Sequence, residues 1–563
     1  MNKIKLLALC ILGFVARTSA QTPAVSPTRY WIQFTDKKNS PYSVTSPGAF
    51  LTPRSIQRRL NHNIPVVATD IPINANYIDS LVAKGAHIHC RSKWFNGVVV
   101  TLTNPAVLAA IQTLPFVSGS LAVGDVHQTG GAAMTGKWNP VSASASRKTI
   151  PSVPKPVSLN YGYSGNQINM LQGVCLHDQG YQGQGVVIAI LDAGFSHADT
   201  LKAYDSLRAN HQILGTWDFV TEKDSVYNQH FHGEMVLSCM GANLPGQLIG
   251  TAPKANYWLL VSEDVNSEYV VEEYNWANAA EFADSVGADV INTSLGYTTF
   301  DDSTENHTYA DMNGHTTPCA RAANFAANKG IAVVCAEGNL AGTKWNYVGT
   351  PADADSVLAV GAVDGGGVYA SFSSHGPGSA GMIKPAVAAE GAGTVVADFQ
   401  SNTVIPENGT SFASPVMCGM VACLLQAHPY VSVMDLFHYI EQSGSQHNAP
   451  DTLLGYGIPD FCAANLTMGV NNPASLENDF LTSLRPNPFA QGFDFIFWSK
   501  NAQLVTVNLF DLTGRNIFTE KRLLAPVSYN SFHYQDLSSL SSGIYFLSVH
   551  TGNGVFVRKV VKE

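Results

Sequence analysis

The sequence predicts an α/β protein whose main domain is a doubly wound, mostly parallel sheet, preceded by a small α/β domain and followed by a small β-sandwich. Three observations predict this order. Near-continuous apolar runs alternate with helical segments in the middle of the chain, a stretch rich in Gly, Ser, Pro and Thr precedes them, and short alternating strands fill the end. A length of 563 residues agrees, because single cores rarely grow beyond about 250–300 residues.

The composition is that of a globular protein. Hydrophobic residues make up 45% and charged residues 13% of the chain, which excludes a disordered tail or a charged coiled coil. The net charge of −10 includes no block of like charges. Neither nucleic acid nor an anionic membrane is therefore indicated as a partner.

The first 20 residues have the pattern of an export signal. Lys3 and Lys5 precede the apolar run 6–16, and the small residues 18–20 suit a signal peptidase, which would leave Gln21 as the new N-terminus. The run is shorter than the about 20 apolar residues that span a bilayer, and we expect no later stretch to be long enough. A secreted or surface-attached protein is expected, without a membrane-spanning segment after signal removal.

A small α/β domain is expected over residues 21–123. Its strand patterns are Tyr30–Phe34 and Asn96–Leu102, and its helical patterns are Ala75–Lys84 and Asn104–Leu114. Residues 124–160 then lose periodicity and form a predicted linker with a processing site.

The main domain is expected over residues 161–469. Its apolar runs, typical of parallel strands covered on both faces, are Val186–Leu191, Ala288–Asn292, Gly330–Ala336 and Val357–Val363. Helical segments precede two of them, at Tyr269–Val286 and Cys319–Asn328. This alternation predicts an active site outside the carboxyl ends of the strands.

Residues 478–563 form the predicted β-sandwich. The strand patterns are Leu504–Leu509, Gly543–Val549 and Val555–Val561, with turn residues at Asp511–Gly514 and Gly552–Gly554.

The eight cysteines that follow the signal have no CxxC pair or metal-ligand spacing, so no structural zinc site is expected. Cys335, Cys418 and Cys423 stand in apolar stretches and are predicted to be buried small hydrophobic residues. The pattern leaves any disulfide pairing open.

Three polar residues stand where strand ends and helix starts are expected. Asp192 ends the apolar run 187–191, His232 precedes a helical run of small residues, and Ser411 lies just before the apolar helix 416–427. Each alone also has a structural interpretation, as a turn residue, a structural histidine or an N-cap.

The neighbours of His232 add two expectations. His230 could join it as a metal ligand, but no third ligand with a suitable pattern accompanies the pair, and no metal site is predicted. Gly233 should leave room for a substrate backbone.

Together the three residues predict nucleophilic catalysis. A serine hydroxyl needs an imidazole to take its proton and a carboxylate to hold that imidazole in the right tautomer. The chain order is Asp, His, Ser, whereas α/β-hydrolases run Ser, Asp, His and chymotrypsin-like enzymes His, Asp, Ser.

With this order and the element Gly409-Thr410-Ser411-Phe412-Ala413-Ser414-Pro415, the sequence resembles the subtilisin-like serine peptidases (subtilases) from about Gly162 to Asn465. The resemblance implies a secreted serine endopeptidase, made as a zymogen, with Asp192, His232 and Ser411 as its catalytic triad.

The resemblance also implies roles for other positions. Asn339, in Ala336-Glu337-Gly338-Asn339, would help the Ser411 backbone N–H to form the oxyanion hole. Ser294, Leu295 and Gly296 would pair with the substrate backbone and line the pocket for the residue before the scissile bond. Ala336 and Gly338 would form the facing wall of that pocket.

This chain departs from the family pattern at three positions. Met235 replaces the family's usual second histidine, Ala193 replaces the Ser or Thr after the catalytic Asp, and Glu337 brings a carboxylate where a small residue is usual. The last change leaves the primary specificity open.

The flanking domains resemble other parts of such precursors. The N-terminal unit is similar to a subtilase propeptide, a chaperone and inhibitor that is later removed. The C-terminal domain, with Arg485–Phe489, Leu509–Arg515 and Ser542–Leu547, resembles a type IX secretion sorting domain. This resemblance implies the type IX export machinery as a partner, besides protein or peptide substrates; a carbohydrate-binding or spacer sandwich is the alternative.

Two other functions fit the sequence less well. A catalytically inactive subtilase-fold adhesin or scaffold would be marked by loss of a triad residue or of Asn339, and all are present. A lipase or esterase would need Gly-x-Ser-x-Gly, which the Ser411 context lacks. No cofactor is required by the predicted chemistry. Structural calcium would find oxygen ligands at Asp301-Asp302, although no diagnostic loop is present.

Overall fold

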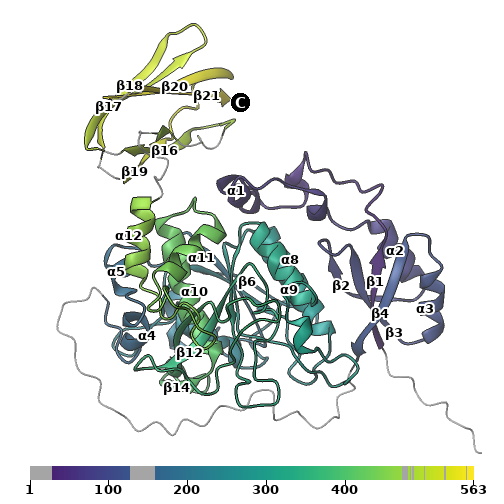
Figure 1. Ribbon diagram of the computed structural model, residues 1–563. Helices are drawn as coiled ribbons and strands as arrows, with labels where there is room; N and C mark the ends of the chain where they lie inside the picture. The colour runs from purple at the N-terminus through teal and green to yellow at the C-terminus, as the bar shows by residue number, and fades with distance from the viewer. Residues whose placement is uncertain are drawn as a thin grey trace, which may run out of the picture.

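The computed structural model describes residues 28–126, 159–471 and 480–563, the last range without residues 482–483, 485–486, 500, 525–527 and 553. The signal peptide and most of the linker predicted at 124–160 lie outside the described residues. Figure 1 shows the central domain between the propeptide-like unit, in purple, and the C-terminal unit, in yellow.

The central domain is built on an eight-stranded sheet in the order β14-β13-β12-β11-β10-β5-β9-β6. Neighbouring strands are parallel except β14, which pairs antiparallel with β13. The strands are β5 Val187–Asp192, β6 Ile213–Asp218, β9 Asn256–Val261, β10 Val290–Thr293, β11 Ala332–Ala336, β12 Val357–Asp364, β13 Val387–Ala397 and β14 Val404–Asn408. The doubly wound, mostly parallel prediction is confirmed.

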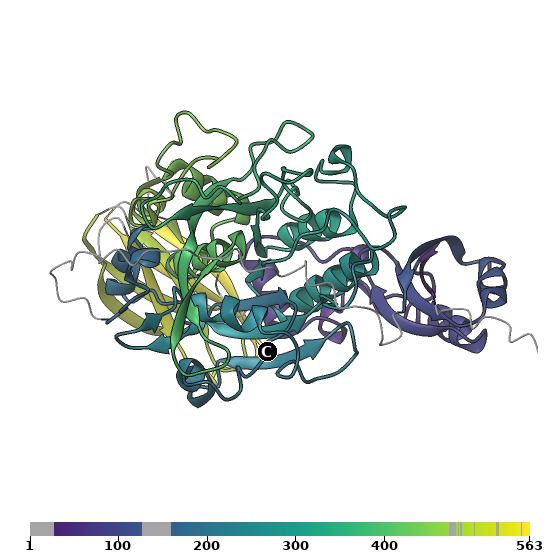
Figure 2. The ribbon, with the colours of Figure 1, turned by 90° about the horizontal axis from the view of Figure 1, so that it is seen from below.

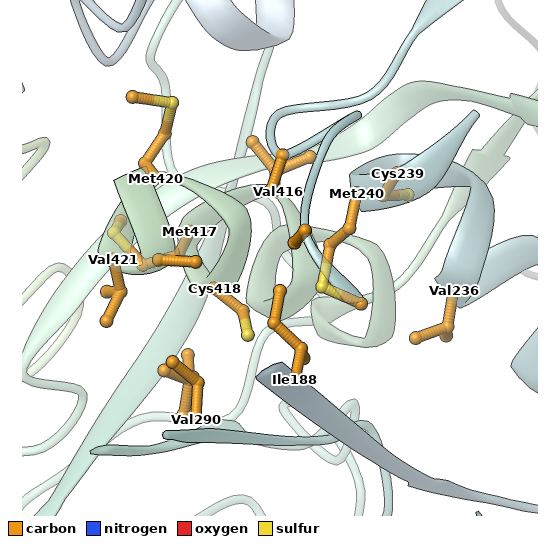
Figure 3. Packing of buried hydrophobic residues seen from close by; sticks show 14 of the residues in the cluster. Ile188, Val236, Cys239, Met240, Val290, Val416, Met417, Cys418, Met420 and Val421 are labelled. Carbon is orange, nitrogen blue, oxygen red and sulfur yellow. The ribbon is translucent and has the colours of Figure 1, made fainter. Parts of the chain in front are cut away.

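Helices cover both faces of this sheet. On one face lie α7 (His232–Gly241) and α10 (Thr410–Ala427), and on the other lie α8 (Val271–Val286) and α9 (Pro318–Asn328). Figure 3 shows Ile188 and Val290 of the sheet facing Met417, Cys418 and Val421 of α10. Strands buried on both faces carry apolar residues at every position, which is why the sequence shows them as continuous runs.

The central domain has further helices and two short strands. The helices are α4 Gly165–Asn169, α5 Val174–Asp178, α6 Asp205–Ala209, α11 Val433–Gln442 and α12 Phe461–Asn471, and the strands are β7 Asn243–Leu244 and β8 Leu248–Ile249. A disulfide joins Cys175 of α5 to Cys462 of α12, 287 positions apart. Cys335, Cys418 and Cys423 are free and fully buried, as predicted.

One described helix, α10, meets the length and hydropathy of a membrane span, contrary to the expectation that no later stretch would be long enough. Of its 18 residues, 89% are buried inside the domain. Its apolar character is explained by its place between the sheet and the surrounding helices.

The propeptide-like unit has a four-stranded antiparallel sheet, in the order β2-β3-β1-β4. Its elements are β1 Thr28–Phe34, α1 Pro53–Asn61, α2 Ala75–Ala83, β2 His87–Ser92, β3 Gly97–Leu102, α3 Pro105–Gln112 and β4 Val117–Asp125. One face of the sheet packs on α2 and α3. The other face joins the hydrophobic core around α8 and α9, and Figure 2 shows the purple unit beside the teal central domain. There Trp31 stacks on Tyr274 with ring centroids 4.7 Å apart.

Helix α1 makes a second contact with the central domain, at the C-terminal ends of α8 and α9. Buried Arg58 donates to the carboxylate of Asp284 at 2.5 Å and to the backbone oxygen of Lys329 at 3.1 Å. Arg59 lies 2.9 Å from the same carboxylate. Exposed carbonyls at a helix C-terminus carry partial negative charge, so these arginines stabilise both helix ends.

The C-terminal unit contains two antiparallel sheets, β15-β16-β19 and β18-β17-β20-β21, around one core of its own. The strands are β15 Phe480–Leu481, β16 Phe493–Ser499, β17 Gln503–Asp511, β18 Asn516–Leu524, β19 Ser528–Tyr534, β20 Gly543–Thr551 and β21 Gly554–Lys562. Two sheets that share a core form the predicted β-sandwich.

Candidate active site

The fold brings together the three residues predicted to form a triad. Asp192 ends β5, His232 begins α7, and Ser411 is the second residue of α10. Asp192 is fully buried, and its Oδ1 lies 2.7 Å from Nδ1 of His232. At that distance Asp192 accepts a hydrogen bond from the Nδ1–H group, which leaves Nε2 of the ring to exchange a proton with another group.

Ser411 and His232 line the same cleft, whose volume is about 610 Å³. The cleft lies at the carboxyl edge of the sheet, where the alternation of strands and helices predicted an active site. Ser411 stands in the first turn of α10, whose backbone N–H groups lack partners within the helix. The first turn of a helix carries partial positive charge, so Ser411 stands at the positive end of α10.

Gly233 has a different role from the one predicted. A Cβ built on Gly233 would lie 2.6 Å from the carbonyl oxygen of Gly194 and 2.8 Å from Cβ of Asp192. The space beside His232 is thus occupied by the end of β5 and the turn after it, not by a substrate backbone. The absent side chain is what allows α7 to approach β5 closely enough for the Asp192–His232 contact.

Asn339 is held in one orientation. Its Oδ1 accepts the backbone N–H of Thr410 at 2.9 Å and the Thr410 hydroxyl at 3.0 Å. Since the oxygen is engaged by two donors, the Nδ2 group is the part of the amide left for the cleft, which Asn339 lines. Thr410 also accepts the Gly338 N–H at 3.1 Å, so this loop is fixed against the start of α10.

The five predicted substrate-contacting residues also line the cleft: Ser294, Leu295, Gly296, Ala336 and Gly338. The Ser294 hydroxyl donates to the backbone oxygen of Ser411 at 2.8 Å. Asn292 Oδ1 accepts the Ser414 hydroxyl at 3.0 Å. These bonds tie the loop after β10 to helix α10.

Glu337 is buried between the cleft wall and the core. Its exposed fraction is 0%, and neither carboxylate oxygen has a hydrogen-bond partner among the described residues. Burial raises the pKa of Glu337 well above its usual value, and the nearby Lys384 ammonium opposes the rise. Lys384 is buried as well and donates to the Ala354 carbonyl at 2.7 Å.

The cleft has lining residues that the sequence motifs did not reveal. Phe231 and Phe399 stack with centroids 4.2 Å apart. Glu263, Glu268 and Glu407 come from segments without a recognisable motif. The sequence shows that these residues are apolar or acidic, but no sequence pattern indicates that they lie close together in space.

His230 does not join a metal site in the described residues. Its Nδ1 accepts the His232 backbone N–H at 3.3 Å, and burial lowers its pKa to about 4. Three carboxylates, of Glu263, Glu268 and Glu272, have oxygens within 4.8 Å of one another. Asp301, from the acidic loop noted in the sequence, accepts the Glu268 N–H at 3.1 Å.

Comparison with known proteins identifies the family of the central domain. Residues 183–457 match the model of the subtilase family. Subtilisin DY from Bacillus licheniformis is 32% identical over 259 residues, which are 45% of this chain and 81% of that protein. The chain belongs to the subtilase family.

Another subtilase, subtilisin E from Bacillus subtilis, is 32% identical over 267 residues, 46% of this chain, and the match spans 61% of its length. Among solved structures, that of proteases from Pseudoalteromonas arctica has 21% identity and a TM-score of 0.42, covering 55% of this chain and 99% of that one.

The flanking domains of this subtilase match two further family models. Residues 29–135 match the peptidase S8 propeptide domain of Bacteroidota, and residues 483–563 match a secretion-system C-terminal sorting domain. The protein is therefore a subtilase precursor that is secreted or attached to the cell surface.

Proposed function

We propose that this subtilase is a serine endopeptidase that hydrolyses peptide bonds through Asp192, His232 and Ser411. The observation that carries the proposal is the 2.7 Å contact between Asp192 Oδ1 and His232 Nδ1, beside a serine at a helix start in the same cleft.

The first half of the reaction acylates the enzyme. Ser411 Oγ attacks the scissile carbonyl carbon while His232 Nε2 takes the hydroxyl proton, and Asp192 stabilises the imidazolium that results. The C–N bond then breaks as His232 returns the proton to the leaving amine. A water molecule, deprotonated by His232 in turn, attacks the ester carbonyl and releases Ser411.

The carbonyl oxygen gains its negative charge between these steps. Asn339 Nδ2 and the backbone N–H of Ser411 are the donors we assign to it. The orientation of the Asn339 amide supports this role, because Thr410 engages its oxygen from two sides. The chemistry uses groups of the protein and a water molecule and needs no cofactor.

We further propose that the enzyme matures by its own cleavage and reaches the surface through type IX export. The match of residues 29–135 to a peptidase propeptide supports the first step, and the separate core of the C-terminal sandwich supports its use as a removable sorting unit. The domain boundaries we propose are 21–123, 161–469 and 478–563.

The proposal is tested with two variants of the full-length precursor. Ser411→Ala should abolish casein hydrolysis and fluorophosphonate labelling and leave the propeptide attached. Asn339→Ala should lower kcat by roughly 10²–10³-fold, the loss known for the corresponding donor in subtilisin, with KM nearly unchanged. Casein hydrolysis by Ser411→Ala would refute the mechanism, and an inactive wild type would favour a surface scaffold.

A further inference from the structure

The walls of the cleft differ in charge from the rest of the molecule. Besides the fully buried Glu337, four acidic residues line it, and its described lining includes no lysine or arginine. The chain as a whole has 42 acidic and 32 basic residues. The four lining acids are Glu263, Glu268, Asp301 and Glu407. A cleft lined this way raises the local concentration of cationic substrates.

One group of these acids lies at the end of the cleft that continues from Gly296. The backbone N–H of Asp301 donates to the Glu268 carbonyl at 2.8 Å, and the Glu268 N–H donates to the Asp301 carboxylate at 3.1 Å. These reciprocal bonds fix the two loops side by side. Since the Ser294–Gly296 edge is the proposed place of the acyl half of the substrate, the loops flank residues upstream of the scissile bond.

The same corner holds further negative charge that is only partly hydrated. Oxygens of Glu263 and Glu272, both buried, lie within 4.8 Å of a Glu268 oxygen. Glu263 accepts the Tyr297 hydroxyl at 2.7 Å and Glu272 accepts the Asp264 N–H at 3.1 Å, so these two carboxylates are held in place at this corner. In the precursor a propeptide guanidinium, that of Arg29, already interacts electrostatically with Glu272.

Glu407 lines the cleft from β14, where it is half-buried. Burial raises the pKa of Glu407, and its electrostatic interaction with His232 opposes the rise. His232 gives its proton to the leaving amine in the proposed mechanism, so the chain that follows the scissile bond passes this side of the imidazole. A cationic side chain just downstream of the bond therefore comes within reach of the Glu407 carboxylate.

We propose that the cleft selects peptides that carry lysine or arginine on both sides of the scissile bond. The upstream cation lies against Glu268 and Asp301, and the downstream cation lies against Glu407. This substrate class rests on the proposed peptidase function. Charge-assisted hydrogen bonds to each cation should favour a basic over a neutral residue by about tenfold or more in kcat/KM.

The experiment is a positional library of internally quenched peptides, cleaved by the mature full-length product. Wild type should prefer Lys and Arg at one upstream and one downstream position. Glu268→Gln should reduce only the upstream preference and Glu407→Gln only the downstream one. Asp205→Asn, an exposed acid outside the cleft that pairs with Arg208, is the matched control and should change neither.

Salt provides a second measurement that needs no variant. Raising the ionic strength should lower the ratio of basic to neutral peptide hydrolysis by wild type, because screening weakens partly exposed charge pairs. Ser411-dependent hydrolysis with no basic preference, or with a preference that neither variant nor salt reduces, would overturn the proposal. Absence of any Ser411-dependent hydrolysis would instead refute the peptidase function on which it rests.

Discussion

Arg58 of the propeptide domain offers a direct test of how that domain is held. Its side chain is 3% exposed and donates to the Asp284 carboxylate at 2.5 Å, the Ala288 carbonyl at 2.5 Å and the Lys329 carbonyl at 3.1 Å. Arg58→Ala removes these three bonds and a longer one, of 3.4 Å, to the Asp284 carbonyl. It also leaves the carbonyls at the ends of α8 and α9 without this donor.

The magnitude follows from what remains around Asp284. Breaking a buried ion pair costs about 3–5 kcal/mol when the other charge is left unpaired. Asp284 keeps Arg59 at 2.9 Å and Lys93 at 3.1 Å, so the loss should be at the lower end of that range. About 3 kcal/mol corresponds to roughly a 100-fold or greater rise in Kd.

The assay measures binding of the separately produced propeptide domain, which has its own core, to a catalytic unit carrying Ser411→Ala. Calorimetry gives Kd directly and does not depend on inhibition. Gln57→Ala is the control, because the Gln57 amide donates to Asn61 of the same helix at 2.9 Å. A rise in Kd of less than about fivefold for a folded Arg58→Ala domain would refute the reasoning.

Three more predictions concern pH, the triad carboxylate and export. Relative to His89→Gln, wild-type propeptide binding should weaken as pH falls below about 6.5, because burial lowers the pKa of His89 and the free domain binds a proton that the complex excludes. Burial raises the pKa of Glu281 to about 7, which favours binding at low pH to the same extent in both proteins. Identical pH profiles of binding for the two proteins would contradict the assignment to His89. Ala193→Ser should raise Tm by about 2 °C, because the new serine hydroxyl can donate to Asp192 Oδ2, which is buried without a partner among the described residues. The control Ala193→Val adds no donor and should not raise Tm. Deleting residues 480–563 should leave the catalytic unit folded and active but retained in the cell, as fractionation and assay would show; unchanged arrival at the surface or in the medium would refute a sorting role.

The main strands could be predicted because both of their faces are covered. β5, β10, β11 and β12 therefore carry apolar residues at nearly every position, and the sequence shows them within two residues of their observed bounds. β6 was not predicted: it is the edge strand of the sheet, most of its residues are partly exposed, and no apolar run marks it.

The three triad candidates could also be predicted from the sequence, because Asp192, His232 and Ser411 each stand at a strand end or helix start and together follow the order Asp, His, Ser. The tertiary structure decided what depends on segments far apart in the chain. It oriented the Asn339 amide through Thr410 and paired Cys175 with Cys462. It also gathered the cleft carboxylates from separate loops. A local pattern records the conformation and burial of its own segment, whereas such contacts arise only when distant segments meet in space.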